Sequence, residues 1–242
     1  MSAPATTEAK PAVRRRTPEI VPLTPPPLQS GDHLTVAEFE RRYNAMTQVK
    51  KAELVEGVVF MASPVSTYHA DAHAAMVAWL KLYAAATPGT RTGDNVTVRL
   101  DAKNEVQPDV YLGVREKHGG AVRLSREGYL DAAPELVVEI AVTSADMDLH
   151  EKFELYRRHR VREYLVWQVL DSRFHWFVLQ GSRYSELRAG PDGLIRSRFF
   201  GGLWLDVPAL LADDFGRVAK SLTAGLDSPD HAEFAAKLTA KK

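Results

Sequence analysis

Two carboxylates interrupt apolar segments of this sequence, and they are the first candidates for chemistry. Glu139 is the one charged residue in the run Leu136–Val142. A buried carboxylate without a partner costs several kcal/mol, so Glu139 needs a counter-charge or a function. Asp109 stands in the same way among mostly apolar residues of the segment Val106–Val114. Because successive side chains of a strand point to opposite faces, each acid projects from one face of its segment.

Asp109 and Glu139 together predict a negatively charged pocket. If they lie on neighbouring strands and point the same way, they either raise the pKa of one carboxyl or recruit a hard cation such as Mg²⁺. The cation accounts for both acids at once. Such an ion would suit hydrolysis, because a bound metal lowers the pKa of water and neutralises a phosphate.

A lysine follows Glu139 by thirteen residues, in a segment with helical spacing over 148–160. This residue, Lys152, falls in the first turns of the expected helix, so it can lie near the end of the strand that carries the acid. An ammonium group there would stabilise developing charge on a phosphate or help to deprotonate an attacking water. The alternative is a solvated lysine beside Asp148 and Glu151 on a charged helix face.

His69 stands at the start of the first long helical segment, residues 68–86. It is a candidate to orient water or to contact phosphate, and the alternative is a local hydrogen bond at the helix start. His69 and His73 also have the i, i+4 spacing of a zinc pair. The glutamate that follows the first histidine in metalloprotease helices is replaced by Ala70, so the pattern does not favour zinc proteolysis.

The segments around these residues predict an α+β domain in which helices pack against one mixed β-sheet. Thr35 and Glu38 have the spacing of a capping box, which predicts a short helix over 34–40. A Glu-Gly turn inside 52–61 predicts a β-hairpin ahead of the long helix. Further strands are expected over 95–100, 106–114, 136–142, 164–170, 174–179, 184–188 and 194–199.

Composition excludes several classes of protein. The 31 basic and 31 acidic residues cancel, so any contact with nucleic acid must use a local patch. The chain has no cysteine, which excludes disulfides, thiolate metal sites, cysteine nucleophiles and iron–sulfur clusters and fits a reducing cytoplasm. Glycine-rich phosphate loops are missing, and no apolar run suggests a secretory signal or a membrane span. We therefore expect a cytoplasmic protein that does not bind a membrane.

The chain divides into three predicted regions. Residues 1–30 hold half of the 14 prolines and a run of three arginines, which predicts a disordered basic arm. Residues 31–215 carry the expected strands and helices and form the main domain. Residues 216–242 are expected to form a helical appendage.

Several spaced blocks of the sequence resemble the PD-(D/E)XK nuclease superfamily and, within it, the Uma-two family of restriction endonucleases. The resemblance runs from about Thr35 to Asp213. Its central blocks are Pro108-Asp109, Glu139 in an apolar strand, and Glu151-Lys152 in the next helix. The other matching blocks are Glu53–Gly57, Ser63-Pro64 followed by His69, Glu135–Ile140, Val161–Tyr164 and Leu205–Pro208.

The resemblance implies a restriction-endonuclease-like core with an added N-terminal β-hairpin. It implies Mg²⁺-dependent hydrolysis of DNA phosphodiester bonds, with Mn²⁺ as a possible substitute and with Asp109 and Glu139 as the metal ligands. It also implies that the superfamily's lysine has moved from the position of Ala141 to Lys152 on the following helix. The superfamily often has an acidic residue facing the metal where His69 stands.

A homodimer or higher homo-oligomer is expected, because cutting two DNA strands requires two active sites. Phe174 and Trp176 share one face of a predicted strand, and we interpret this aromatic pair as part of a subunit interface.

Two other functions stay open. The fold could serve as a binding or regulatory module without cleavage, which the zero net charge favours. Retention of Asp109, Glu139 and Lys152 argues against that alternative. The same residues would also serve a metal-dependent hydrolase of a substrate other than DNA.

Overall fold

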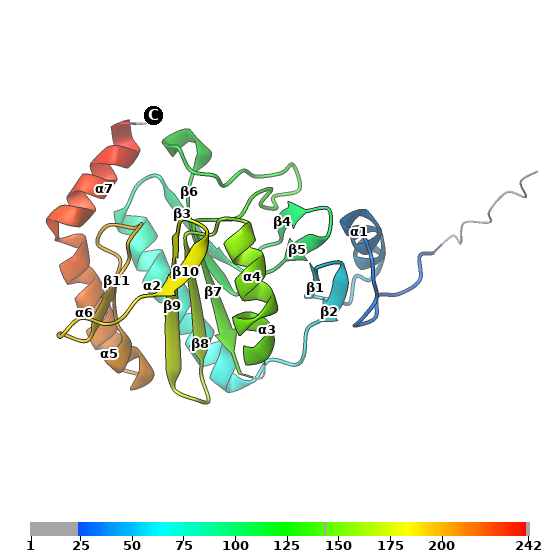
Figure 1. Cartoon of the computed structure of the whole chain (residues 1–242), viewed down its shortest axis with the longest axis horizontal. Coiled ribbons are helices and arrows are strands. Elements are labelled where there is room, and N and C mark those ends of the chain that lie inside the picture. Colours follow the sequence, from blue (N-terminus) through cyan, green and yellow to red (C-terminus); the bar gives the residue numbers. More distant parts are fainter. Residues whose placement is uncertain (1–23, 143, 241–242) are drawn as a thin grey trace, which may run out of the picture.

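A six-stranded mixed sheet forms the centre of the molecule, with helices on both faces (Figure 1). The computed structural model describes residues 24–142 and 144–240. The strand order is β10-β9-β8-β7-β6-β3, in which β7 and β8 are parallel and every other pair is antiparallel. The strands are β3 (Thr90–Asp94), β6 (Val110–Val114), β7 (Leu136–Ala141), β8 (Glu163–Gln168), β9 (Arg173–Gln180) and β10 (Arg183–Glu186). The predicted α+β class is confirmed.

Helix α2 (Thr67–Ala86) covers one face of this sheet. The Ser66 side chain caps it by accepting a hydrogen bond from the His69 amide. Trp79 packs edge-on against Trp176 of β9 with ring centroids 5.7 Å apart, and both side chains are fully buried. The predicted place of Trp176 in a subunit interface is therefore wrong, because the core of the chain itself encloses this residue.

Helices α3 (Ala145–Leu149) and α4 (Glu151–Arg158) cover the opposite face. The sequence predicted one helix over 148–160, but the chain breaks at His150, which has a non-helical ψ of −77°. This break starts a new helix at Glu151. The inner side of α4 then carries Lys152 and, one turn later, Tyr156, and both are buried.

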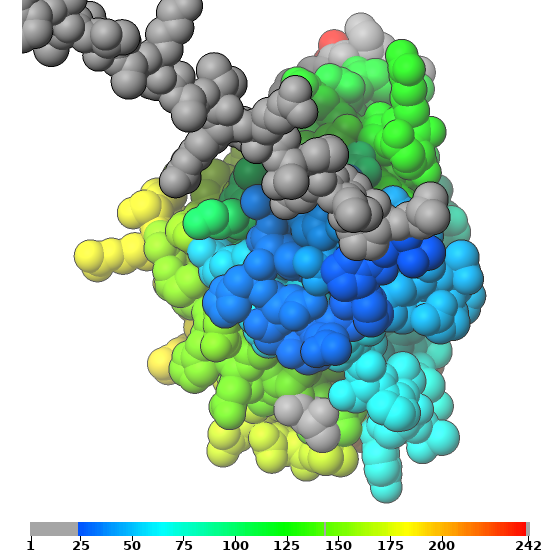
Figure 2. All heavy atoms as spheres, turned by 90° about the vertical axis from the view of Figure 1, so that its right-hand side faces the viewer, coloured from blue at the N-terminus to red at the C-terminus, as the bar shows by residue number. Residues whose placement is uncertain are grey.

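A smaller four-stranded antiparallel sheet with the order β2-β1-β5-β4 lies beside the first. Its strands are β1 (Ala52–Val55), β2 (Val58–Met61), β4 (Val98–Asp101) and β5 (Asn104–Val106). The predicted hairpin is the β1–β2 pair, whose turn has positive φ at Glu56 and Gly57. Helix α1 (Val36–Ala45) packs here through Phe39, and Thr35 caps it as predicted. Figure 2 looks at the molecule from the right-hand side of Figure 1, and the blue segment that includes α1 lies at the front of this view.

The segment 106–114, predicted as one strand, is divided between the two sheets. Pro108 has no amide hydrogen for a ladder, and the residues Gln107–Asp109 connect β5 to β6. Asp109 thus lies at the junction of the sheets. This division also corrects the expectation of a single mixed sheet.

The C-terminal part adds a two-stranded ribbon and three helices. Helix α6 contributes Val218 and Leu222 to the core beneath α2. These elements are β11 (Leu194–Arg196), β12 (Trp204–Asp206), α5 (Val207–Leu211), α6 (Phe215–Leu226) and α7 (Pro229–Ala240). Strands β3 and β12 were not predicted.

Residues 1–23 of the predicted basic arm fall outside the described residues. Among the helices of residues 24–142 and 144–240, none is both long and apolar enough to span a bilayer.

Candidate active site

All four residues singled out by sequence line one open cavity of about 490 Å³. The cavity lies at the carboxyl end of β7, between the start of α2, the α3–α4 segment and β1. The predicted residues are Asp109, Glu139, Lys152 and His69.

Strand pairing brings the two acids together. Val110 of β6 pairs with Val138 of β7, so the next residues outward, Asp109 and Glu139, come side by side. The Oδ2 atom of Asp109 accepts a 2.8 Å hydrogen bond from the backbone amide of Ile140, the residue after Glu139. The two acids predicted to share a pocket therefore lie side by side, near the start of β6 and the end of β7.

Asp109 is held as a charged group although it is buried. Its Oδ2 atom lies 3.3 Å from His69 Nε2, and its Oδ1 atom accepts a 2.9 Å hydrogen bond from Lys51 Nζ. Burial acts to raise the pKa of Asp109, but the contact with His69 and the charge of Lys51 outweigh it and hold that pKa well below the usual range.

Glu139 is only 2% exposed and is surrounded by donors. Its Oε1 atom accepts hydrogen bonds from Lys152 Nζ at 3.0 Å and from the Tyr156 hydroxyl at 2.8 Å. Burial raises the pKa of Glu139, and the charge of Lys152 opposes that rise. Burial outweighs that charge, so the pKa of Glu139 stays raised, and any further positive charge would favour the ionised carboxylate.

Lys152 is a buried cation rather than a surface lysine. It is 3% exposed, and its Nζ lies 2.9 Å from Glu53 Oε2 and 3.9 Å from Asp148 Oδ1 in addition to its contact with Glu139. Burial acts to lower the pKa of Lys152, but the surrounding carboxylates raise it well above its ordinary value. The alternative of a solvated lysine is wrong, because α4 turns this side chain into the pocket.

Glu53 and Lys51 also line the pocket. The sequence allowed Glu53 a place in the pocket but favoured a turn or rim position beside the hairpin, and it did not single out Lys51. Glu53 of β1 reaches Lys152 and also accepts a 2.7 Å hydrogen bond from the Gln107 amide. Lys51 lies just before β1, and its side chain is 27% exposed at the mouth of the cavity. The alternation of polar and apolar residues in β1 is a signal for Glu53. No local pattern separates Lys51 from its neighbour Lys50.

The two histidines have different partners. Nε2 of His69 faces the Asp109 carboxylate, whereas Nε2 of His73 lies 3.0 Å from the Asp109 backbone carbonyl, to which it can donate. Their rings stack with centroids 5.9 Å apart. Within residues 24–142 and 144–240, no group of three or more His, Cys, Asp or Glu side chains is arranged to hold a metal ion.

The donor set nevertheless suits a hard divalent cation in chemistry and charge. Four carboxylates and two ammonium groups line the cavity, so full ionisation leaves two negative charges without a counter-charge. Carboxylate oxygens are the ligands that Mg²⁺ and Mn²⁺ prefer. In this conformation Lys51 contacts Asp109 and Lys152 contacts Glu139, so a metal ion held by both acids would require the partly exposed Lys51 side chain to move off Asp109. The six groups are Glu53, Asp109, Glu139, Asp148, Lys51 and Lys152.

Comparison with known proteins agrees with this geometry. Residues 36–208 match the model of the Uma2 family, described as "Putative restriction endonuclease". The chain belongs to this family. The matched span contains every residue that lines the 490 Å³ cavity, called the acid pocket below, and all six strands of the central sheet.

A solved structure shares the fold of this Uma2 chain. It is the crystal structure of "a putative nuclease belonging to DUF820" from Anabaena variabilis. The two chains are 13% identical with a TM-score of 0.56, and the match covers 69% of this chain and 92% of the other. Among curated proteins, none matches the chain. The structural likeness confirms the predicted nuclease-like fold.

Proposed function

We propose that this protein is a metal-dependent endonuclease that hydrolyses DNA phosphodiester bonds. The observation that carries the proposal is the meeting of Asp109, Glu139 and a buried Lys152 in one open cavity. Burying Asp109 and Glu139 side by side is costly for a protein that only binds, and a hydrolase has a use for such a pair. Membership of a family described as restriction endonucleases supports the same reaction.

Asp109 and Glu139 would hold Mg²⁺, with Mn²⁺ as a substitute. When bound, the ion would supply a neutralising charge for the phosphate and a lowered pKa for the attacking water. Tyr156 and Lys152 orient the Glu139 carboxylate through Oε1. The Ile140 amide orients the Asp109 carboxylate through Oδ2.

Lys152 acts in this proposal as a fixed positive charge. It lies between Glu53 and Glu139 at 2.9 and 3.0 Å, so its proton is stabilised from two sides and it is a poor base. Its charge holds the acids in place and offsets negative charge that develops on a phosphate. Lys51 is the more exposed ammonium group, and we assign it to contact with phosphate oxygens at the cavity mouth.

His69 is assigned to positioning. Its side chain is 23% exposed at the cavity, and the Nε2 atom faces Asp109. It therefore orients the acid from the wall of the cavity that water and phosphate would enter. A homodimer and a cytoplasmic location stay predictions.

One observation favours a second function, that of a binding or regulatory module that does not cleave. The acids are already paired with Lys51 and Lys152, and the part of the chain that the structure describes has no ready group of three metal-binding side chains. A hydrolase of another phosphate ester would use the same residues.

A metal titration with matched variants tests the proposal. Plasmid and single-stranded DNA are incubated with wild type, with Glu139→Gln, and with the control Glu186→Gln, whose carboxylate is exposed on β10. We expect cleavage that requires Mg²⁺ or Mn²⁺ and that falls by a factor of about a hundred or more in Glu139→Gln, since a preorganised charge group is lost. Full cleavage by Glu139→Gln, or none by wild type at any metal concentration, would contradict the proposal.

A further inference from the structure

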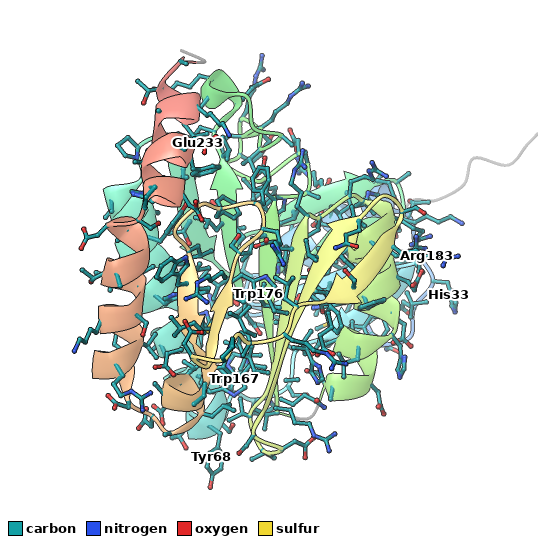
Figure 3. The ribbon with its side chains drawn as sticks, turned by 60° about the vertical axis from the view of Figure 1, so that its left-hand side comes forward. His33, Tyr68, Trp167, Trp176, Arg183 and Glu233 are labelled. Carbon is teal, nitrogen blue, oxygen red and sulfur yellow. The ribbon has the colours of Figure 1, made fainter. Side chains whose placement is uncertain are left out.

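A second cavity of about 220 Å³ opens on the other side of the first turns of α2. Tyr68 and Asp71 of α2 line it, whereas His69 and His73 of the same turns line the acid pocket. Trp167 from β8 lines the opposite side. Figure 3 shows Tyr68 and Trp167 close to the same end of the molecule.

Strand register makes the two cavities neighbours. Ile140 of β7 lines the acid pocket, and its partner across the parallel ladder, Trp167 of β8, lines the second cavity. Adjacent strands lie about 4.8 Å apart. A strand whose phosphate lies at the acid pocket would therefore have to pass the first turns of α2 to place one of its bases in the second cavity.

The walls of the second cavity suit a flat polar ring rather than a phosphate. Tyr68, Trp167 and Phe215 supply aromatic surface. Tyr68 is 61% exposed, which is a large exposed fraction for an aromatic side chain. Asp71 and Asp213 are exposed carboxylates whose side chains pair with no other residue in the described part of the chain, and no lysine or arginine lines the cavity. Such a site repels phosphate and accepts hydrogen bonds from amino groups.

We propose that this second cavity binds one unpaired nucleobase of the substrate and prefers a base with an exocyclic amino group. Tyr68 stacks on the ring, as aromatic side chains do on single-stranded nucleic acid. Asp71 or Asp213 accepts from the amino group, as a carboxylate does from N4 of cytosine. The proposal rests on the proposed nuclease function and narrows its substrate, because a base reaches such a cavity from a single strand, or from a duplex only after it is flipped out of the stack.

Oligonucleotide binding without metal tests the proposal separately from cleavage. The full chain is titrated in EDTA with labelled oligo(dC) and oligo(dT), two pyrimidine strands of which only the first carries an exocyclic amino group. Fluorescence anisotropy is expected to show binding of oligo(dC) about fivefold or more tighter than oligo(dT). Tyr68→Ala should weaken both by about tenfold through lost stacking.

Two further variants sharpen the comparison. The double variant Asp71→Asn/Asp213→Asn should remove most of the preference for oligo(dC), since an amide is a weaker acceptor than a carboxylate. Leu82→Ala is the control, because Leu82 is 47% exposed on the same helix and lies outside both cavities. It should bind both strands like wild type.

The outcomes separate this inference from the nuclease proposal. A preference for oligo(dC) that these variants remove supports the base site even if wild type never cuts DNA. Metal-dependent cutting with equal affinity for both oligonucleotides and no effect of Tyr68→Ala overturns the base site and leaves the nuclease. A Tyr68→Ala variant that changes only the sedimentation of the protein also overturns it, because the cavity would then be a contact between two copies of the chain.

Discussion

Replacing Lys152 with methionine is the sharpest perturbation of the acid pocket. Methionine has a similar length and apolar stem but removes the charge that lies 2.9 Å from Glu53 and 3.0 Å from Glu139. All three side chains are less than 10% exposed, so water cannot replace the lost ammonium group fully. The variant therefore leaves adjacent buried carboxylates without a shared counter-charge.

The expected cost follows from that burial. Removing one partner of a buried ion pair typically destabilises a protein by about 3–5 kcal/mol. Adding Glu139→Gln to Lys152→Met removes one of the stranded charges, so the double variant should be more stable than Lys152→Met alone by about 1–3 kcal/mol. Mg²⁺ should stabilise Lys152→Met more than wild type, because the ion would replace the missing positive charge.

Urea denaturation followed by tryptophan fluorescence, with and without Mg²⁺, measures these differences. Lys50→Met is the control, since Lys50 is exposed and close in sequence to the pocket. Lys152 is not the buried counter-charge of these acids if Lys152→Met is as stable as wild type. The same conclusion follows if Glu139→Gln lowers the free energy of unfolding of Lys152→Met as much as it lowers that of wild type. An equal effect of Mg²⁺ on both proteins would refute the link between the ammonium group and the metal.

Three other predictions concern separate contacts. Tyr156→Phe removes a buried 2.8 Å hydrogen bond to Glu139, so its free energy of unfolding in urea should fall by about 2 kcal/mol. Gly225→Ala places a methyl group against the Gly202 carbonyl and the Trp204 ring, and a thermal scan should show destabilisation of about 1–3 kcal/mol. Burial raises the pKa of Glu105, so the folded state holds this proton more tightly than the unfolded chain and wild type should lose stability as the pH rises above the usual glutamate range. Thermal scans at several pH values should show a smaller loss in Glu105→Gln, and an identical profile would contradict this reasoning.

Local sequence patterns were enough to find the main acids and the elements that carry them. Glu139 and Asp109 stood out because a carboxylate in an apolar strand is costly wherever that strand packs. The α1 cap and the β1–β2 turn were predictable for a similar reason, since capping and turn residues act within a few positions of themselves. These features depend on short stretches of chain.

The contacts that complete the site could not be read from such stretches. Glu53 contacts Lys152, which lies 99 positions later in the sequence, and Lys51 contacts Asp109, which lies 58 positions later. Trp176 looked like an interface residue because strand alternation gives the face but not what covers it, and here α2 and the C-terminal helices cover it.

The sequence by itself determined which reactive side chains the site contains, namely two acids, a lysine and a histidine. It also assigned each of them to a predicted strand or helix. Only the tertiary structure decided that β6 pairs with β7 so that Asp109 meets the Ile140 amide, and that the break at His150 turns Lys152 inward. The second cavity beside α2 was decided in the same way, because its walls come from three separate parts of the chain. The physical reason is that periodicity and capping report local free energies, whereas strand order and the packing of distant helices depend on contacts that no local pattern contains.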